Sequence, residues 1–290
     1  MGRACLSGPH VEACATLEAT SVRRIYPEQD WCSMWKATYL YDLEEVYGEH
    51  RDLGYAYSYA QRHDFTIQAL TEVLPPGSRI LDIAAAQGNF SLALAELGYE
   101  VTWNDLRADM IDYVKMKHEK GNVSYVAGNA FELEFPHLFD GVVITEIIEH
   151  VAHPDQFLAN TARLVRPGGY IIMTTPNGQY FRNDLPKFSE CEDPSAFESV
   201  QFKANAGGHI FLLHKDEVEE FAGAVGLQIK RFALFNNPLT SGHLKLSKLL
   251  QRLPKSTVDA CERMTQQLPE PVAARISMQM GVLFQKPLNS

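Results

Sequence analysis

The chain has 290 residues, a formal net charge of −10, 46% hydrophobic residues and 21% charged residues. This length allows one large domain with appendages and is sufficient for a sizeable hydrophobic core. The acidic charge balance argues against a nucleic-acid partner, which would favour a basic surface. Because the sequence has neither an apolar run long enough to span a bilayer nor a secretory signal, we expect a cytoplasmic protein without a membrane span.

The cysteines are scattered, odd in number and without a Cys-x-x-Cys pair. A disulfide framework or a zinc site would require paired spacing, so this pattern predicts reduced thiols. The five residues are Cys5, Cys14, Cys32, Cys191 and Cys261.

Two helices are predicted before the first strand. Apolar and aromatic residues recur at helical spacing in Trp31–Tyr47 and in Tyr55–Val73, and Pro75-Pro76 stops the second helix. Residues 1–28 show no clear period. The helices belong to an N-terminal helical segment, residues 1–74, for which two interpretations stay open. They form either a helix pair packed on the core or a lid over a substrate pocket.

The stretch Arg79–Phe90 is the centre of the pattern. A short apolar run, typical of a strand buried on both faces, is followed by Ala84-Ala85-Ala86 and Gly88 and then by a helix. In such a strand–loop–helix unit a ligand can approach the loop backbone and lie near the positive end of the helix. Asp82 at the mouth of the strand favours a cationic ligand over a phosphate.

Strands and helices alternate along most of the remaining chain. Beyond the strand at 79–83, the pattern predicts strands at 100–105, 122–126, 139–145, 170–175, 227–235 and 277–285. It predicts helices at 90–97, 106–117, 154–165 and 216–225, and a mostly helical insertion at about 238–271. This order predicts an α/β fold with a doubly wound, mostly parallel seven-stranded sheet and helices on both faces.

The segment Asp82-Ile83-Ala84-Ala85-Ala86-Gln87-Gly88 resembles the first motif of the class I (Rossmann-like) S-adenosylmethionine-dependent methyltransferases, an acid followed by alternating small residues. Two of the three glycines of that motif are alanine here, and alanine tolerates positive φ poorly. The resemblance covers about residues 75–235 and, by architecture, 277–286. It implies an S-adenosylmethionine-binding domain at 75–290, an antiparallel last strand and a small-molecule methyl acceptor.

The resemblance also implies where the cofactor binds. Asp105, at the end of the second strand, would accept both ribose hydroxyls, although an N-cap of the following helix is the alternative role. Asn129 would contact adenine, and Arg62 or Arg51 could pair with the cofactor carboxylate, although a solvated surface position is the simpler expectation for an arginine. The expected cofactor-binding residues are Asp82, Ala84, Ala86, Gln87, Gly88, Asn89, Phe90, Asp105, Leu106, Asn129, Ala130, Thr145 and Glu146.

The segment from Glu146 to His150 reads Glu-Ile-Ile-Glu-His. It is similar to the ubiquinone-pathway O-methyltransferases and to the small-RNA 3′-terminal 2′-O-methyltransferases. In those families two glutamates, the adjoining histidine and a later histidine hold a divalent metal. The matching positions here are Glu146, Glu149, His150 and His209. Mg²⁺ or another divalent cation bound there would orient two neighbouring hydroxyls and lower the pKa of the attacking oxygen.

Two alternatives for this group of residues stay open. A metal-free histidine base that titrates near neutral pH is one, and purely structural roles are the other. The candidate catalytic residues are Glu149, His150, His153 and His209.

The leading hypothesis is therefore a methyltransferase that acts on a small-molecule hydroxyl. The alternatives are an RNA ribose 2′-O-methyltransferase, an NAD-dependent dehydrogenase and a non-catalytic S-adenosylmethionine-binding protein. A dehydrogenase would require glycine at positions 84, 86 and 89, where the chain has Ala, Ala and Asn. The helical insertion is interpreted as a substrate cap, a homodimer surface or a covering of the sheet.

Overall fold

The computed structural model describes residues 22–49, 52–201 and 208–288. Seven strands form one sheet in the order β3-β2-β1-β4-β5-β7-β6. Pairing is parallel from β3 to β5, and β7 lies antiparallel between β5 and β6. The strands are β1 (Arg79–Ile83), β2 (Glu100–Asp105), β3 (Asn122–Ala127), β4 (Phe139–Thr145), β5 (Val165–Pro176), β6 (Gln228–Phe235) and β7 (Gln279–Gln285). The predicted fold class and the antiparallel last strand are confirmed.

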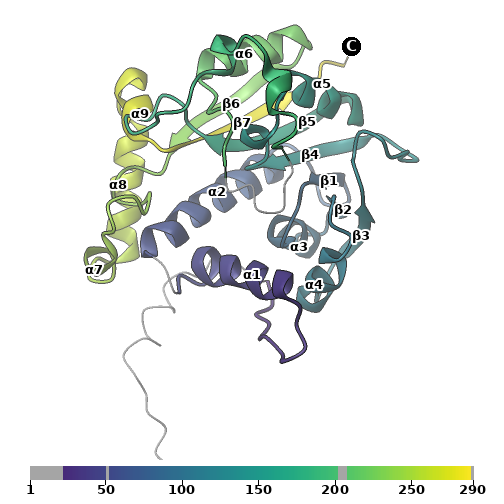
Figure 1. The fold of residues 1–290 in the computed structure, drawn as a ribbon, viewed down its shortest axis with the longest axis horizontal. Helices are drawn as coiled ribbons and strands as arrows, with labels where there is room; N and C mark the ends of the chain where they lie inside the picture. Colours follow the sequence, from purple (N-terminus) through teal and green to yellow (C-terminus); the bar gives the residue numbers. More distant parts are fainter. Residues whose placement is uncertain (1–21, 50–51, 202–207, 289–290) are drawn as a thin grey trace, which may run out of the picture.

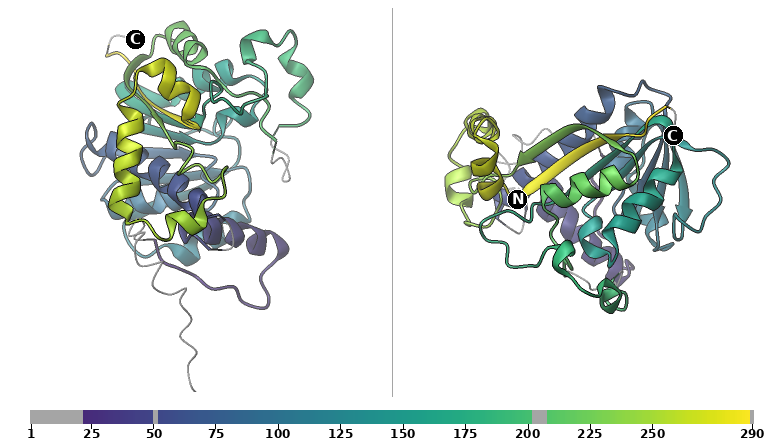
Figure 2. Two further views of the ribbon diagram at one scale, coloured as in Figure 1. Left: turned by 90° about the vertical axis from the view of Figure 1, so that its left-hand side faces the viewer. Right: turned by 90° about the horizontal axis from the view of Figure 1, so that it is seen from above.

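Helices cover both faces of the sheet (Figures 1 and 2). The helices are α1 (Ser33–Tyr41), α2 (Leu53–Thr71), α3 (Asn89–Glu96), α4 (Met110–Lys117), α5 (Pro154–Leu164), α6 (Lys215–Ala224), α7 (Ser247–Leu250), α8 (Lys255–Gln266) and α9 (Glu270–Ile276). Short 3₁₀ turns occur at η3 (Ile148–His150), η4 (Phe188–Glu190) and η5 (Pro194–Phe197). The last two lie in the long connection after β5.

Neighbouring residues of the central strands enter different parts of the core. Leu81 and Val142 pack with α5 and α6, whereas Ile80 and Val143 pack with α2 and α3. Successive side chains of a strand point to opposite faces, so a strand covered by helices on both sides needs apolar residues at every position. This requirement explains why the central strands read as continuous apolar runs.

The described residues of the N-terminal helical segment pack on this core. The predicted helix at 31–47 is divided into α1 and a π-helix, η2 (Asp42–Val46). Trp31, Tyr39 and Leu43 lie in one apolar cluster with Tyr113 and Val114 of α4. In Figure 1, α1 accordingly lies across the end of the molecule beside α3 and α4.

Three details differ from the expected elements. The helix after β2 begins at Met110 instead of residue 106, because residues 106–109 form a turn. Residues 166–169, which lie between the predicted helix at 154–165 and the predicted strand at 170–175, belong to β5. The insertion is helical only from Ser247 onward, and Figures 1 and 2 show α7, α8 and α9 at one side of the molecule.

Cys32, Cys191 and Cys261 carry free thiols, as predicted, and Cys5 and Cys14 lie outside the described residues. Within the described part of the chain, no helix combines the length and the apolar character needed to cross a membrane.

Candidate active site

The loop after β1 places alanine in a backbone conformation that favours glycine. Ala84 and Ala86 have φ angles of 57° and 45°, and Gly88 has a φ of 71°. Each left-handed alanine costs about 1–2 kcal/mol. The loop thus keeps the backbone expected of an alternating small-residue motif, and the two alanines carry strain that glycine would not have.

Contacts from β2 hold this strained loop. The Ala86 amide donates to an Asp105 carboxylate oxygen at 3.0 Å, and the Ala85 amide donates to the Asn104 carbonyl at 2.9 Å. The Trp103 indole donates to the Ala86 carbonyl at 3.2 Å. Because the end of β2 satisfies the polar groups of the loop, the loop conformation depends on the neighbouring strand.

Asp82 is buried beneath the loop, with 1% of the residue exposed. One carboxylate oxygen accepts from the Ser91 hydroxyl at 2.6 Å, and the other has no hydrogen-bond partner among the described residues. Burial, with a smaller contribution from the nearby Asp105 charge, raises the pKa of Asp82 to about 7. A cationic ligand would stabilise the ionised form of this carboxyl.

Asp105 lies at the end of β2, as predicted, but it does not cap the following helix. The N-cap residue of α4 is Asp109. The Asp105 carboxylate accepts from the backbone and guanidinium of Arg107, with the shortest contact 2.8 Å from Arg107 Nε. A ribose that bound both carboxylate oxygens would have to displace this arginine side chain.

The remaining expected cofactor residues occupy different environments. Gly88, Asn89 and Ala130 are buried, Leu106 is exposed, and Ala84, Ala86, Gln87, Phe90, Asn129, Thr145 and Glu146 are half-buried. The Asn129 side chain accepts from the Phe131 amide and donates to Glu132. Its amide therefore already has local partners beside the presumed adenine position.

The loop after β4 begins at Glu146, which has a φ of 52°. One Glu146 carboxylate oxygen accepts from Arg62 at 3.1 Å and from Gln279 at 2.8 Å. Arg62 also bonds to Glu45 at 3.0 Å, and 12% of its side chain is exposed. The expectation of a solvated Arg62 is therefore wrong: α2 places it between two carboxylates. Arg51 lies outside the described residues.

Glu149, His150 and His209 come together in space. One potential ligand atom from each lies within 4.8 Å of the others. Glu149 is 1% exposed, and one of its oxygens accepts from the Thr175 hydroxyl at 3.0 Å. The other oxygen has no hydrogen-bond partner in the described structure and lies 3.9 Å from His150 Nε2. Within that structure, Glu146 is not part of this three-residue group.

Backbone contacts hold this group together. The Ile210 amide donates to the Glu149 carbonyl at 2.8 Å, which places the segment around His209 next to the 3₁₀ turn η3. His150 Nδ1 lies 3.2 Å from the Gly208 carbonyl, so a neutral ring that donates there leaves Nε2 unprotonated. The two histidine rings lie 4.9 Å apart between centroids.

The electrostatic environment of the group suits a cation. Burial lowers the pKa of His150 and, with a contribution from His150, lowers the pKa of His209 to about 4. Burial and the neighbouring Glu146 raise the pKa of Glu149 well above its usual range. Two neutral imidazoles and one carboxyl that a positive charge would ionise form a donor set that fits a divalent cation.

His153 lies apart from this group. Its Nε2 lies 2.9 Å from a Glu198 carboxylate oxygen, and within the described part of the chain it is not one of the three clustered residues. His153 therefore has less support as a base than His150 or His209 does.

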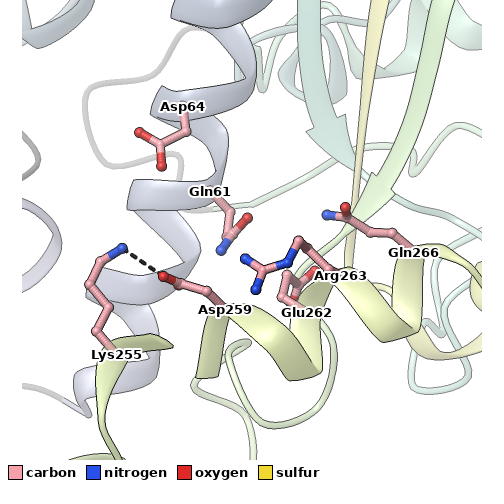
Figure 3. A pocket seen from close by; sticks show the side chains of 7 residues that line it. All are labelled: Gln61, Asp64, Lys255, Asp259, Glu262, Arg263 and Gln266. Atoms are coloured by element: carbon pink, nitrogen blue, oxygen red, sulfur yellow. Dashed lines mark hydrogen bonds and ion pairs between the residues drawn. The ribbon is translucent and has the colours of Figure 1, made fainter. Parts of the chain in front are cut away.

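A separate polar pocket lies between α2 and α8 (Figure 3). Its volume is about 180 Å³, below the roughly 300–1,000 Å³ typical of ligand sites. Lys255 and Asp259, both of α8, form an ion pair at 2.9 Å at its edge, and none of its lining residues is a predicted site residue. We interpret this pocket as the packing boundary between the insertion and α2.

Comparisons with known proteins agree with the geometry. A family model described as a methyltransferase domain matches residues 49–231. The chain is 34% identical over 179 residues to a ubiquinone biosynthesis O-methyltransferase of Rhizobium etli. The matched region covers 59% of this chain and 68% of that relative. A protein of the same description from Burkholderia thailandensis is 26% identical over 178 residues, covering 56% and 75%.

Solved structures support the fold. An S-adenosylmethionine-dependent methyltransferase from Mesorhizobium loti superposes with a TM-score of 0.51 and 16% sequence identity. The match covers 77% of this chain and 98% of that structure. Identity at this level supports the architecture alone.

Proposed function

Because the chain belongs to the class I S-adenosylmethionine-dependent methyltransferases, we propose that it transfers the S-adenosylmethionine methyl group to a hydroxyl oxygen of a small molecule. The relatives in Rhizobium etli and Burkholderia thailandensis are named as O-methyltransferases, which favours oxygen as the acceptor atom. The same proposal includes a cytoplasmic location, which remains a prediction from the sequence.

The group Glu149, His150 and His209 is the observation that carries the proposal. These residues would hold Mg²⁺ or another divalent cation, with Glu146 close enough to raise the pKa of Glu149. Such a cation, when bound, would lower the pKa of an acceptor hydroxyl and orient a neighbouring one. A substrate with two adjacent hydroxyls fits this chemistry best.

The remaining roles follow from the two loops. Asp105 and the residue 84–90 loop would bind the adenosine, and Asp82 would lie beneath the positively charged part of the cofactor. The acceptor oxygen forms a bond to the methyl carbon while the carbon–sulfur bond breaks, and sulfur keeps the electron pair as S-adenosylhomocysteine forms. The hydroxyl proton passes to solvent when His150 and His209 hold the cation, and to a neutral His150 or His209 in the metal-free alternative. In-line positioning supplies much of the rate enhancement in such a transfer.

The 3′-terminal ribose of an RNA is the second candidate acceptor, since it also offers two adjacent hydroxyls. The formal net charge of −10 argues against it, because phosphate contacts require a basic surface. One arm of the test therefore compares methyl transfer to a small catechol-type acceptor, which has two adjacent hydroxyls, with methyl transfer to an RNA 3′ end.

The test begins with calorimetric titration of S-adenosylmethionine into the purified chain, with and without Mg²⁺ after chelation. We expect a dissociation constant in the micromolar range. Turnover is then followed as S-adenosylhomocysteine release with a catechol-type acceptor and with RNA. Absence of cofactor binding would contradict the assignment of the cofactor site. Binding without release on any hydroxyl acceptor would favour the non-catalytic alternative.

A further inference from the structure

A buried ion pair joins the N-terminal helical segment to α4. Lys117 Nζ lies 2.7 Å from a carboxylate oxygen of Asp42 in the π-helix η2. The side chain of Lys117 is 0% exposed and that of Asp42 is 1% exposed. Lysine and aspartate are rarely buried to this extent unless they are paired, so the contact is a specific feature of this chain.

The same lysine holds the loop after β1. Its ammonium donates to the Gln87 carbonyl at 3.2 Å and to the Asn89 side-chain oxygen at 2.5 Å. The Asn89 amide nitrogen donates to Asp42 at 2.8 Å, and the Tyr113 hydroxyl donates to Asp42 at 2.7 Å. All three ammonium protons of Lys117 therefore have an acceptor, and two of the acceptors belong to the presumed cofactor loop.

Packing reinforces this contact between the loop and α4. Gly88 lies between Gln87 and Asn89, and a Cβ at Gly88 would lie 2.5 Å from a methyl carbon of Val114. Val114 and Lys117 are three residues apart and lie on one face of α4. One face of α4 thus contacts the loop in two ways. Val114 packs closely against the backbone at Gly88, and Lys117 donates hydrogen bonds to the residues on either side, Gln87 and Asn89.

The π-helix η2 also reaches the second loop of the site. Glu45 of η2 bonds to Arg62 at 3.0 Å, and Arg62 bonds to Glu146 at 3.1 Å. Through Asp42, η2 therefore contacts the loop after β1, and through Glu45 and Arg62 it is linked to the loop after β4. A π-helix is a rare conformation that is found frequently at functional sites.

We propose that Lys117 and Asp42 are positioning residues that hold residues 87–89 in the cofactor-binding conformation and couple the docking of α1 and η2 to cofactor binding. The inference rests on the proposed function, because it takes the loop after β1 as the cofactor site. An opening of α1 and η2 away from α4 would leave Lys117 charged and without its carboxylate partner. On this proposal, α1 and η2 form a wall of the cofactor site that the bound cofactor holds more firmly in place, and they do not act as a lid over the acceptor.

The test measures binding of S-adenosylhomocysteine, which does not turn over, to four proteins. They are the wild type, Lys117→Met, the double variant Asp42→Asn with Lys117→Met, and the control Lys286→Met. We expect about tenfold or greater weakening in the Lys117 variants, because charge-assisted hydrogen bonds to the loop are lost. The double variant leaves no unpaired buried charge and is expected to fold even where Lys117→Met does not.

Lys286 is a matched control because its amine also donates to two backbone carbonyls, those of Ala162 and Val165, each at 3.0 Å. It lies after β7, away from the cofactor loop, so we expect lower stability and unchanged affinity in Lys286→Met. Hydrogen exchange supplies a readout that a purely structural role would not change. In the wild type, the cofactor product should slow exchange of amides in residues 33–46, and in the Lys117 variants this slowing should disappear.

The outcomes of these measurements separate failure of the proposed coupling from failure of the proposed function. Folded Lys117 variants that bind S-adenosylhomocysteine within twofold of the wild type would overturn the coupling while leaving the proposed function intact. Weakened affinity with the exchange response of residues 33–46 preserved would also overturn it. A wild type that does not bind S-adenosylhomocysteine would overturn the proposed function itself.

Discussion

The two loops of the site differ in how their buried polar groups are satisfied. Around the loop after β1, the backbone bonds to Asp105 and Trp103 of β2 and to Lys117 of α4. In the loop after β4, Glu146 and Glu149 each keep one buried oxygen without a hydrogen-bond partner among the described residues. Buried polar atoms are nearly always paired in native proteins. We infer that the protein itself holds the backbone of the first loop, whereas the glutamates of the second loop, like Asp82 beneath the first, gain their missing partners from what they bind.

The largest expected effect concerns the second loop. Glu149→Gln keeps the shape of the side chain and its bond from Thr175 but removes the charge that a cation requires. We expect the affinity for Mg²⁺ or Mn²⁺ to fall more than about 100-fold, because even groups that only support a ligand contribute about 10–100-fold. The measurement is the metal-dependent rise in melting temperature. We expect a similar loss of metal affinity in His209→Ala.

His153→Ala is the control for that experiment, since His153 pairs with Glu198 outside the three-residue group. It should keep the metal response of the wild type. Retention of the full metal response in Glu149→Gln would remove the metal site from the proposal and leave the histidines as candidate bases.

The next effect concerns the first loop and its support. Asp105→Ala removes the presumed ribose acceptor and the bond to the Ala86 amide. We expect cofactor affinity to fall about 10–100-fold, from the loss of charge-assisted hydrogen bonds of about 1.5–3 kcal/mol. Calorimetric titration measures the change. Asp109→Ala, at the N-cap of α4, is the control, and an equal loss of affinity there would point to a general disturbance of the turn.

A further effect, on stability instead of affinity, concerns Asp82, the acid of β1 beneath the first loop, one of whose oxygens has no hydrogen-bond partner among the described residues. Its pKa is raised to about 7 in the folded protein, so between about pH 4 and 7 the folded state binds more protons than the unfolded state. The free energy of unfolding must then fall as pH rises through that window. In Asp82→Asn this dependence is absent. As the pH rises from 4.5 to 7.5, we therefore expect the free energy of unfolding of the variant to increase by about 2–4 kcal/mol relative to that of the wild type.

Urea unfolding of the cofactor-free proteins at the two pH values measures this gain. A difference in unfolding free energy between the two proteins that stays constant from pH 4.5 to 7.5 would contradict the raised pKa of Asp82.

The smallest effect concerns the strain in the first loop. Ala84→Gly and Ala86→Gly relieve a left-handed alanine, and the greater freedom of glycine in the unfolded chain offsets part of the gain. We expect each variant to be stabilised by up to about 1 kcal/mol. Ala85→Gly is the matched control, because Ala85 does not have a positive φ, and it should lose about 0.5–1 kcal/mol. Equal thermal shifts in all three variants would argue against strain at 84 and 86.

Local patterns were the basis of the site prediction. The alternation of small residues after Asp82 and the acid at Asp105 indicated the first loop, and the Glu-Ile-Ile-Glu-His segment indicated the second. The spatial group of Glu149, His150 and His209 is consistent with that hypothesis, although the roles of these residues remain predictions. Gln279, a polar residue at the start of the buried strand β7, donates to Glu146, and pattern reading missed this contact with the candidate site.

The sequence by itself determined the order of strands and helices, because apolar periodicity and turn residues act over a few neighbouring positions. Only the tertiary structure decided which distant charges meet. Arg62 lies between Glu45 and Glu146, and Lys117 lies against Asp42, at separations of 17, 84 and 75 residues along the chain. Whether an arginine or lysine is solvated or buried depends on which elements pack over it, and that packing follows from the fold as a whole.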